Sequence, residues 1–211
     1  METIEGVLFE PVGCLAEFTA EPFLEIAAGL SGKRQTSKSG SRAYWHLLNL
    51  MESSGHQTVE HLELQAVDNA TIYDDVLPAL AELKAMGIKR FIASSLSAAA
   101  ITRFLARCAP ETFDGIWNRD NAGGIKAAPL ARALEAAVLR PNRAMFLTDT
   151  AEGLKLAESV GVNAILMMND PDESRRLATH HPAGGIVSLH ELPDFIRFVR
   201  AQHVTAARDV S

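Results

Sequence analysis

The sequence predicts an α/β fold, a doubly wound parallel sheet with a small inserted helical cap. Buried-type strands alternate with amphipathic helices along most of the chain, and one long stretch near the amino terminus is helical without strands. With 211 residues, 47% of them hydrophobic, the chain is long enough for one sizeable core and a small accessory domain.

The strands are expected where Val, Ile, Leu and Phe fill consecutive positions. Four such runs occupy residues 4–10, 88–94, 143–149 and 162–168. Apolar residues at consecutive positions indicate strands covered on both faces, as in parallel sheets. Residues 115–118 are expected to form a further short strand, and residues 184–199 a strand followed by a helix.

Amphipathic helices are expected between these strands. They occupy residues 75–87, 97–109, 128–139 and 151–161, and Gly87 and Gly161 stand where a helix would end before the next strand. Strands that alternate with helices require right-handed crossovers, so the sheet should be open and doubly wound.

Residues 17–73 interrupt this alternation. Helical segments are expected at residues 21–30 and 42–55, no strand is expected, and the polar Gly/Ser-rich linker 31–42 joins the two helices. Tyr44 and Trp45 are expected to pack either inside this segment or between it and the core. The sequence therefore predicts a core made of residues 1–16 and 74–211 and a helical cap made of residues 17–73.

Composition excludes several classes of partner. A net charge of −6 and a pI near 5.6 argue against binding to nucleic acid or to an anionic membrane, because both require clustered positive charge. Cys14 and Cys108 cannot build a disulfide framework, and neither a secretory signal nor a run of about 18 apolar residues is visible. These features predict a cytoplasmic protein and leave the oligomeric state open, a homo-oligomer included.

Polar side chains stand at the carboxyl ends of the expected strands, where ligands bind in open α/β sheets. Glu10 ends the first strand, Ser94 and Ser95 end the second, and Asp149 ends the third, while Lys126 precedes a helix. Two carboxylates, hydroxyls and an ammonium on one rim suit a divalent cation that bridges to a phosphoryl group.

The motifs at these positions resemble those of the haloacid dehalogenase-like hydrolase superfamily. The four segments, in chain order, are "VLFEPVGCL", "FIASSLS", "GGIKAAP" and "FLTDTAEGLKLAESVGVNAI", and the helical insertion follows the first of them, where the family's cap enters. The resemblance implies a hydrolase of the phosphohydrolase type that acts on a small phosphorylated metabolite.

The resemblance also implies roles for individual residues. Ser94, with Ser95 beside it, would bind the phosphoryl oxygens, and Lys126 would neutralise their charge. Glu10 stands at the position of the nucleophile and Val12 at that of the general acid and base. The resemblance implies Mg²⁺ held by Asp149, Glu10 and the Val12 carbonyl.

The first motif departs from the family's pattern. The family's nucleophile is Asp, and the extra methylene of Glu10 moves the carboxylate by about 1 Å, which can cost about 10²-fold in rate. Val12 cannot transfer protons, and Pro11 has no N–H for an anion. Cys14 replaces the usual Thr, and Gly153 stands where many members carry another acid.

These departures predict low or no turnover, so whether the chain is an enzyme stays open at this stage. One alternative is a non-catalytic protein that binds a small anion, a metal or a protein partner through the same cleft. A second is a dehalogenase-like hydrolase, because that branch also lacks the second acid. A receiver-like domain that accepts phosphate on aspartate ranks lower, because such domains are shorter and lack an inserted cap.

Overall fold

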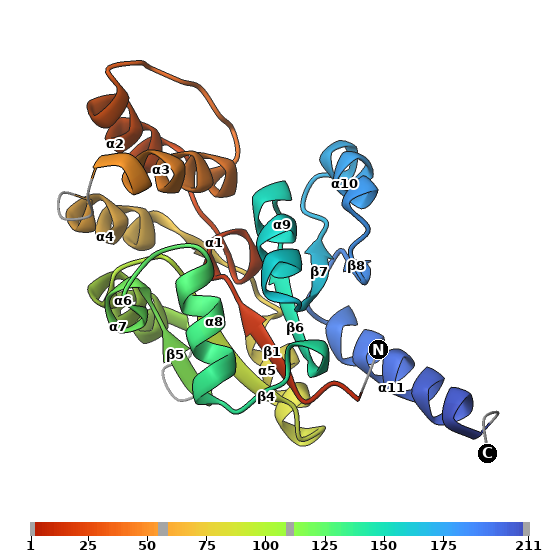
Figure 1. Ribbon diagram of the computed structural model, residues 1–211. Helices are drawn as coiled ribbons and strands as arrows, with labels where there is room; N and C mark the ends of the chain where they lie inside the picture. The colour runs from red at the N-terminus through yellow and green to blue at the C-terminus, as the bar shows by residue number, and fades with distance from the viewer. Residues whose placement is uncertain (1–2, 55–58, 109–111, 209–211) are drawn as a thin grey trace.

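The computed structural model describes residues 3–54, 59–108 and 112–208. The described residues form a six-stranded parallel sheet in the order β5-β4-β1-β6-β7-β8, with helices on both faces (Figure 1). Its strands are β1 (Gly6–Phe9), β4 (Lys89–Ala93), β5 (Gly115–Trp117), β6 (Ala144–Thr148), β7 (Asn163–Met167) and β8 (Gly184–Ile186). This arrangement confirms the predicted fold class.

Strand β1 lies at the centre of the sheet and is buried on both sides. Its residue Leu8 pairs with Phe91 of β4 and with Phe146 of β6. Because side chains alternate along a strand, Val7 and Phe9 belong to one apolar cluster and Leu8 to the other. A strand held in this way places the residue that follows it, Glu10, at a fixed point on the sheet edge.

Helices cover the two faces of the sheet. One apolar cluster includes residues of α5 (Val76–Ala85), α6 (Ala98–Cys108) and α11 (Glu191–Arg208), and the other includes residues of α8 (Ala127–Ala136) and α9 (Ala151–Val160). Shorter helical segments are α1 (Pro11–Cys14), α7 (Arg119–Ala122), α10 (Pro171–Leu177) and the 3₁₀ turns η1 (Pro141–Arg143) and η2 (Ala178–His180). None of the helices in the described part of the chain is long and apolar enough to cross a bilayer.

The helical insertion consists of α2 (Glu21–Ser31), α3 (Gly40–Ser54) and α4 (Glu60–Asn69), beyond the carboxyl end of β1 (Figure 1). The antiparallel pair β2 (Ala16–Glu17) and β3 (Thr71–Ile72) joins it to the core. Its apolar side chains share one cluster with the core, and Phe18 stacks on Phe104 of α6 with ring centroids 6.1 Å apart.

The structure corrects three details of the sequence prediction in this region, and the first is helix α4, which was not among the expected helical segments. Strand β3 lies within residues 17–73, where no strand was expected, because two-residue strands are too short to carry an alternating pattern. Helix α3 begins at Gly40, inside the expected linker. Residues 55–58 of the expected cap, and residues 1–2, 109–111 and 209–211 of the expected core, lie outside the described residues.

Candidate functional site

Glu10 follows β1 directly and turns its carboxyl group toward the neighbouring strand end. Glu10 Oε1 accepts a hydrogen bond from Ser94 Oγ at 2.7 Å and a longer one from Val12 N at 3.4 Å. The Glu10 residue is only 5% exposed, and Val12 is buried beside it. The Val12 N–H, in the turn after β1, therefore points at the Glu10 carboxyl group.

The surroundings of Glu10 favour its neutral form. Burial raises the pKa of Glu10 to about 8, and the nearby Asp149 carboxylate raises it further, while hydrogen bonds from Ser94 and Val12 act in the opposite direction. At pH 7 the neutral form of Glu10 therefore predominates. Because only a carboxylate attacks as a nucleophile, burial suppresses the reactivity of this group.

Asp149 follows β6 and faces the helical insertion. Asp149 Oδ2 accepts hydrogen bonds from Ser41 Oγ of α3 at 2.6 Å and from Asn169 Nδ2 at 3.3 Å. Asn169 Nδ2 also donates to the Gly13 carbonyl at 2.7 Å. Gly13 has φ 82°, and a Cβ atom at this position would overlap Asp149 Oδ2 and Ser41 Oγ. Only glycine allows the turn after β1 to approach Asp149 this closely.

Ser95 and Lys126 are hydrogen-bonded to each other. The Lys126 backbone N donates to Ser95 Oγ at 2.7 Å, and Lys126 Nζ donates to Asn49 Oδ1 of α3 at 2.8 Å. Lys126 has φ 58°, a conformation uncommon outside glycine. Lys126 thus connects the start of α8 to the loop after β4 and to the insertion.

The structure therefore brings the expected residues to one edge of the sheet. Glu10 and Ser94 are hydrogen-bonded, Asp149 is close enough to influence the Glu10 pKa, and Lys126 is joined to this group through Ser95. Val12 contributes its backbone N–H to Glu10. The roles that the family resemblance implies for these residues remain predictions.

Sequence reasoning missed several residues of this edge. Asn169 follows the end of β7, and the strand-end rule that selected Asp149 could have found it. Ser41 stands in a Gly/Ser-rich segment that carries no signal for a site.

A buried ion pair was also missed. Glu63 of α4 binds Arg119 of α7 through Oε1 and accepts from Ser97 N at 3.2 Å through Oε2. Arg119 Nη1 donates to the Ser95 carbonyl at 3.3 Å. Burial raises the pKa of Glu63, and the Arg119 guanidinium opposes this rise. The pair fixes the loop that carries Ser94 and ties the insertion to the core.

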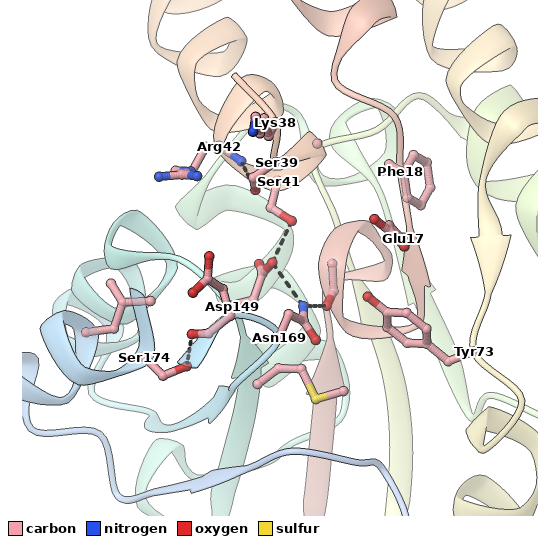
Figure 2. Close-up of a pocket in the computed structure, with 15 residues that line it drawn as sticks. Glu17, Phe18, Lys38, Ser39, Ser41, Arg42, Tyr73, Asp149, Asn169 and Ser174 are labelled. Atoms are coloured by element: carbon pink, nitrogen blue, oxygen red, sulfur yellow. Dashed lines mark hydrogen bonds between the residues drawn. The ribbon is translucent and has the colours of Figure 1, made fainter. Parts of the chain in front are cut away.

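A cavity of about 360 Å³ opens beside Asp149 between the insertion and the sheet (Figure 2). Lys38, Ser39, Ser41 and Arg42, at and before the start of α3, lie on one side of it. Lys38 and Arg42, which belong to the expected polar linker 31–42, therefore line a cavity. Acidic groups, among them Glu17, line it as well, so the cavity combines both signs of charge.

The residues at this edge do not provide the donor set of a divalent-cation site. Asp149 Oδ2 already accepts from Ser41 and Asn169, and Glu10 is buried and largely neutral. A Cβ atom at Gly153 would overlap Thr148 Oγ1, so a third acid has no room there. Among the described residues there is no group of three His, Cys, Asp or Glu side chains that could hold a metal ion. Mg²⁺ usually binds through one or two ionised carboxylates together with waters and substrate phosphates, and with Glu10 largely neutral and Asp149 already hydrogen-bonded this arrangement does not fit it.

Solved structures of similar fold cover nearly the whole chain. A haloacid dehalogenase-like family hydrolase from Streptococcus pneumoniae has a TM-score of 0.68 at 14% identity, over 92% of this chain and 99% of its own. An L-2-haloacid dehalogenase from Xanthobacter autotrophicus has a TM-score of 0.62 at 17% identity, over 92% and 98% of the two chains. At these identities the likeness concerns the fold.

Curated relatives match at higher identity over part of the chain. An enolase-phosphatase E1 from Frankia alni is 34% identical over 117 residues, which are 53% of this chain and 49% of that protein. A second enolase-phosphatase E1, from a Bradyrhizobium species, is 30% identical over 110 residues, 49% and 48% of the two chains. The chain thus spans about half the length of these relatives.

The sequence model of the haloacid dehalogenase-like hydrolases matches residues 24–167, more than half of the 211 residues. The match begins after Glu10 and Val12, so it does not include the altered first motif. It confirms the resemblance carried by the later motifs, and the chain belongs to the haloacid dehalogenase-like hydrolase family.

Proposed function

We propose that the chain binds a small phosphorylated molecule between the sheet edge and the helical insertion, which acts as a cap, and hydrolyses it slowly. The observation that supports this most is the Glu10–Ser94 hydrogen bond of 2.7 Å at the family's active-site edge, inside a buried environment that opposes ionisation of Glu10. The enolase-phosphatase relatives support a phosphorylated substrate.

The proposed reaction uses Glu10 as the nucleophile in its minor, charged form. A Glu10 oxygen forms a bond to phosphorus as the bond to the leaving oxygen breaks, and the leaving group keeps the electron pair. It takes a proton from water, because Val12 has none to give. Water then cleaves the acyl phosphate, which releases phosphate and restores the Glu10 carboxyl group. The missing general acid costs about 10²- to 10⁴-fold.

A second candidate is binding without turnover. The cavity beside Asp149 is lined by Ser39, Lys38 and Arg42, whereas Glu10 is not among its lining residues. A small anion could occupy this cavity without contact with Glu10. The two candidates therefore differ in whether Glu10 acts on the bound molecule.

The test measures phosphate release from p-nitrophenyl phosphate by wild type, Glu10→Gln and the double variant Glu10→Asp, Val12→Asp. We expect slow turnover by wild type, none by Glu10→Gln, and a gain of about 10²-fold or more in the double variant, because it restores both the reach and the general acid. Wild-type turnover should be the same with millimolar Mg²⁺ and with a chelator, since the donor set does not fit the ion.

Each alternative gives a different result. Calorimetric binding of orthophosphate without turnover in wild type or in the double variant would support the binding-only candidate. Chloride release from 2-chloropropionate would support a dehalogenase-like reaction. If Glu10→Gln kept the wild-type rate, hydrolysis through Glu10 would be wrong.

A further inference from the structure

Tyr44 of α3 carries a buried hydroxyl group without a hydrogen-bond partner. Its ring packs against Phe23 of α2 with centroids 5.2 Å apart, and the residue is fully buried. No group among the described residues makes a hydrogen bond with Tyr44 Oη. Leaving a buried polar group unsatisfied costs about 1–3 kcal/mol, and buried tyrosine hydroxyls usually have a partner. The Tyr44 hydroxyl therefore needs an explanation.

The groups around this hydroxyl belong to the candidate site. After burial itself, the Glu10 and Glu63 carboxyl groups contribute most to raising the Tyr44 pKa, and a hydrogen-bonding interaction with the nearby Ser94 hydroxyl lowers it. Ser94 Oγ already donates to Glu10 Oε1 and accepts from Leu96 N at 3.2 Å. The Tyr44 hydroxyl thus lies near Ser94, at the boundary between insertion and core, but makes no well-formed hydrogen bond with the described residues.

The hydroxyl is suited to donate to an anion. Its pKa is well above the ordinary value, so it keeps its proton throughout the neutral range. Val12, at the position where the family's phosphatases have an acid, offers no polar side chain. A fixed neutral donor beside Ser94 can stabilise negative charge on an oxygen at this point without a cost of reorganisation.

We propose that Tyr44 Oη donates a hydrogen bond to an oxygen of the phosphoryl group bound at Ser94, so that the insertion supplies one of the substrate-binding groups. This inference rests on the proposed function, because it requires that the site take such an anion. It also explains why a tyrosine rather than a phenylalanine stands in an otherwise apolar contact with Phe23.

The test measures binding of orthophosphate, and of vanadate as a second probe, by calorimetry. Tyr44→Phe removes only the hydroxyl and should raise the dissociation constant about 10-fold or more, because hydrogen bonds to charged groups are worth about 1.5–3 kcal/mol. The melting temperature of the free protein should stay the same or rise, since an unsatisfied group is removed. Phe23→Leu is the matched control, because it disturbs the same ring contact and keeps the hydroxyl.

The outcomes separate this inference from the proposed function. If wild type bound neither probe, the anion site itself would be wrong, and the role of Tyr44 with it. If wild type bound and Tyr44→Phe bound equally well, the site would stand and the role of Tyr44 would be wrong. If Phe23→Leu weakened binding as much as Tyr44→Phe does, the tyrosine would act only through packing, which also overturns the inference.

Discussion

At the scale of single residues, Glu10 determines what this site can do. Its carboxyl group is enclosed by Ser94 and by the titratable groups Asp149 after β6, Tyr44 of α3 and Cys14 of α1. Burial raises the pKa of the Cys14 thiol as well, with Asp149 and Glu10 adding to the rise. The surroundings of Glu10 therefore disfavour ionisation of Glu10, Cys14 and Tyr44 alike.

This environment links the stability of the fold to pH. The pKa of Glu10 is about 8 in the folded protein and 4.5 in the reference state, so between these values the folded chain holds a proton that the unfolded chain releases. The stabilisation from Glu10 is fully present below about pH 4.5 and is lost as pH rises through about 8.

Replacing Glu10 by Gln should remove this dependence. Because one pKa unit corresponds to about 1.4 kcal/mol, we expect Glu10→Gln to gain up to a few kcal/mol over wild type as pH rises from about 5 to 8. Urea unfolding across this range measures the difference. Glu158→Gln, an exposed change on α9, is the control and should leave the wild-type curve unchanged. Parallel curves for wild type and Glu10→Gln would contradict the burial of an ionisable group at this position.

The residues of the site were predictable to different degrees. Glu10, Ser94 and Asp149 follow strands whose apolar runs are visible in the sequence, and parallel strands end at one edge. Ser41 could not be found in this way, because its contact with Asp149 spans 108 positions and depends on how the insertion folds back. The closeness of Tyr44 to Glu10 has the same origin, since Tyr44 belongs to the insertion.

At the scale of elements, the contact of α4 with the core depends on the Glu63–Arg119 pair. Glu63 is fully inaccessible and Arg119 nearly so, and both also bind the loop that carries Ser94. Removing one partner of a buried pair leaves an uncompensated charge and costs about 3–5 kcal/mol. An exposed pair contributes about 0–1 kcal/mol.

Arg119→Met should therefore destabilise the protein strongly. We expect the free energy of unfolding to fall by about 3–5 kcal/mol, measured by chemical denaturation, because Glu63 remains buried without its counter-charge. The matched control is Arg103→Met, which breaks the Arg103–Asp68 pair between α6 and α4, where both side chains are about half exposed. Equal losses for the two variants would show that the buried pair does not hold α4 to the core.

Most elements were predictable from the sequence, but helix α4, which is ten residues long, and several short segments were not. The strands of the sheet and helices α5, α6, α8 and α9 were predicted within a few residues of their bounds, because their apolar periodicity extends over many positions. Strands β2 and β3 and helix α7 are two to four residues long, so no period can be read from them. Tertiary contacts determine such segments.

At the scale of the whole molecule, the insertion and the core form one apolar unit at the sheet edge. Apolar residues of α2, α3 and α4 share a cluster with β1, α5 and α6, and Ser41 and Glu63 add polar contacts across the same boundary. The fold class and the place of the insertion follow from the sequence pattern. The close packing between the insertion and the core does not follow from the pattern, because apolar residues show which face of an element is buried but not which element covers it.

For the whole site, the central property is that the Glu10 carboxyl group is buried and largely neutral at pH 7. The most direct measurement is a carbon-13 NMR titration of the Glu side-chain carboxyl signals, with the Glu10 signal assigned by its absence in Glu10→Gln. The buried arrangement predicts a midpoint near 8 for this signal. A midpoint near 4.5, the ordinary value, would mean that Glu10 is solvated and charged, and would contradict the claim.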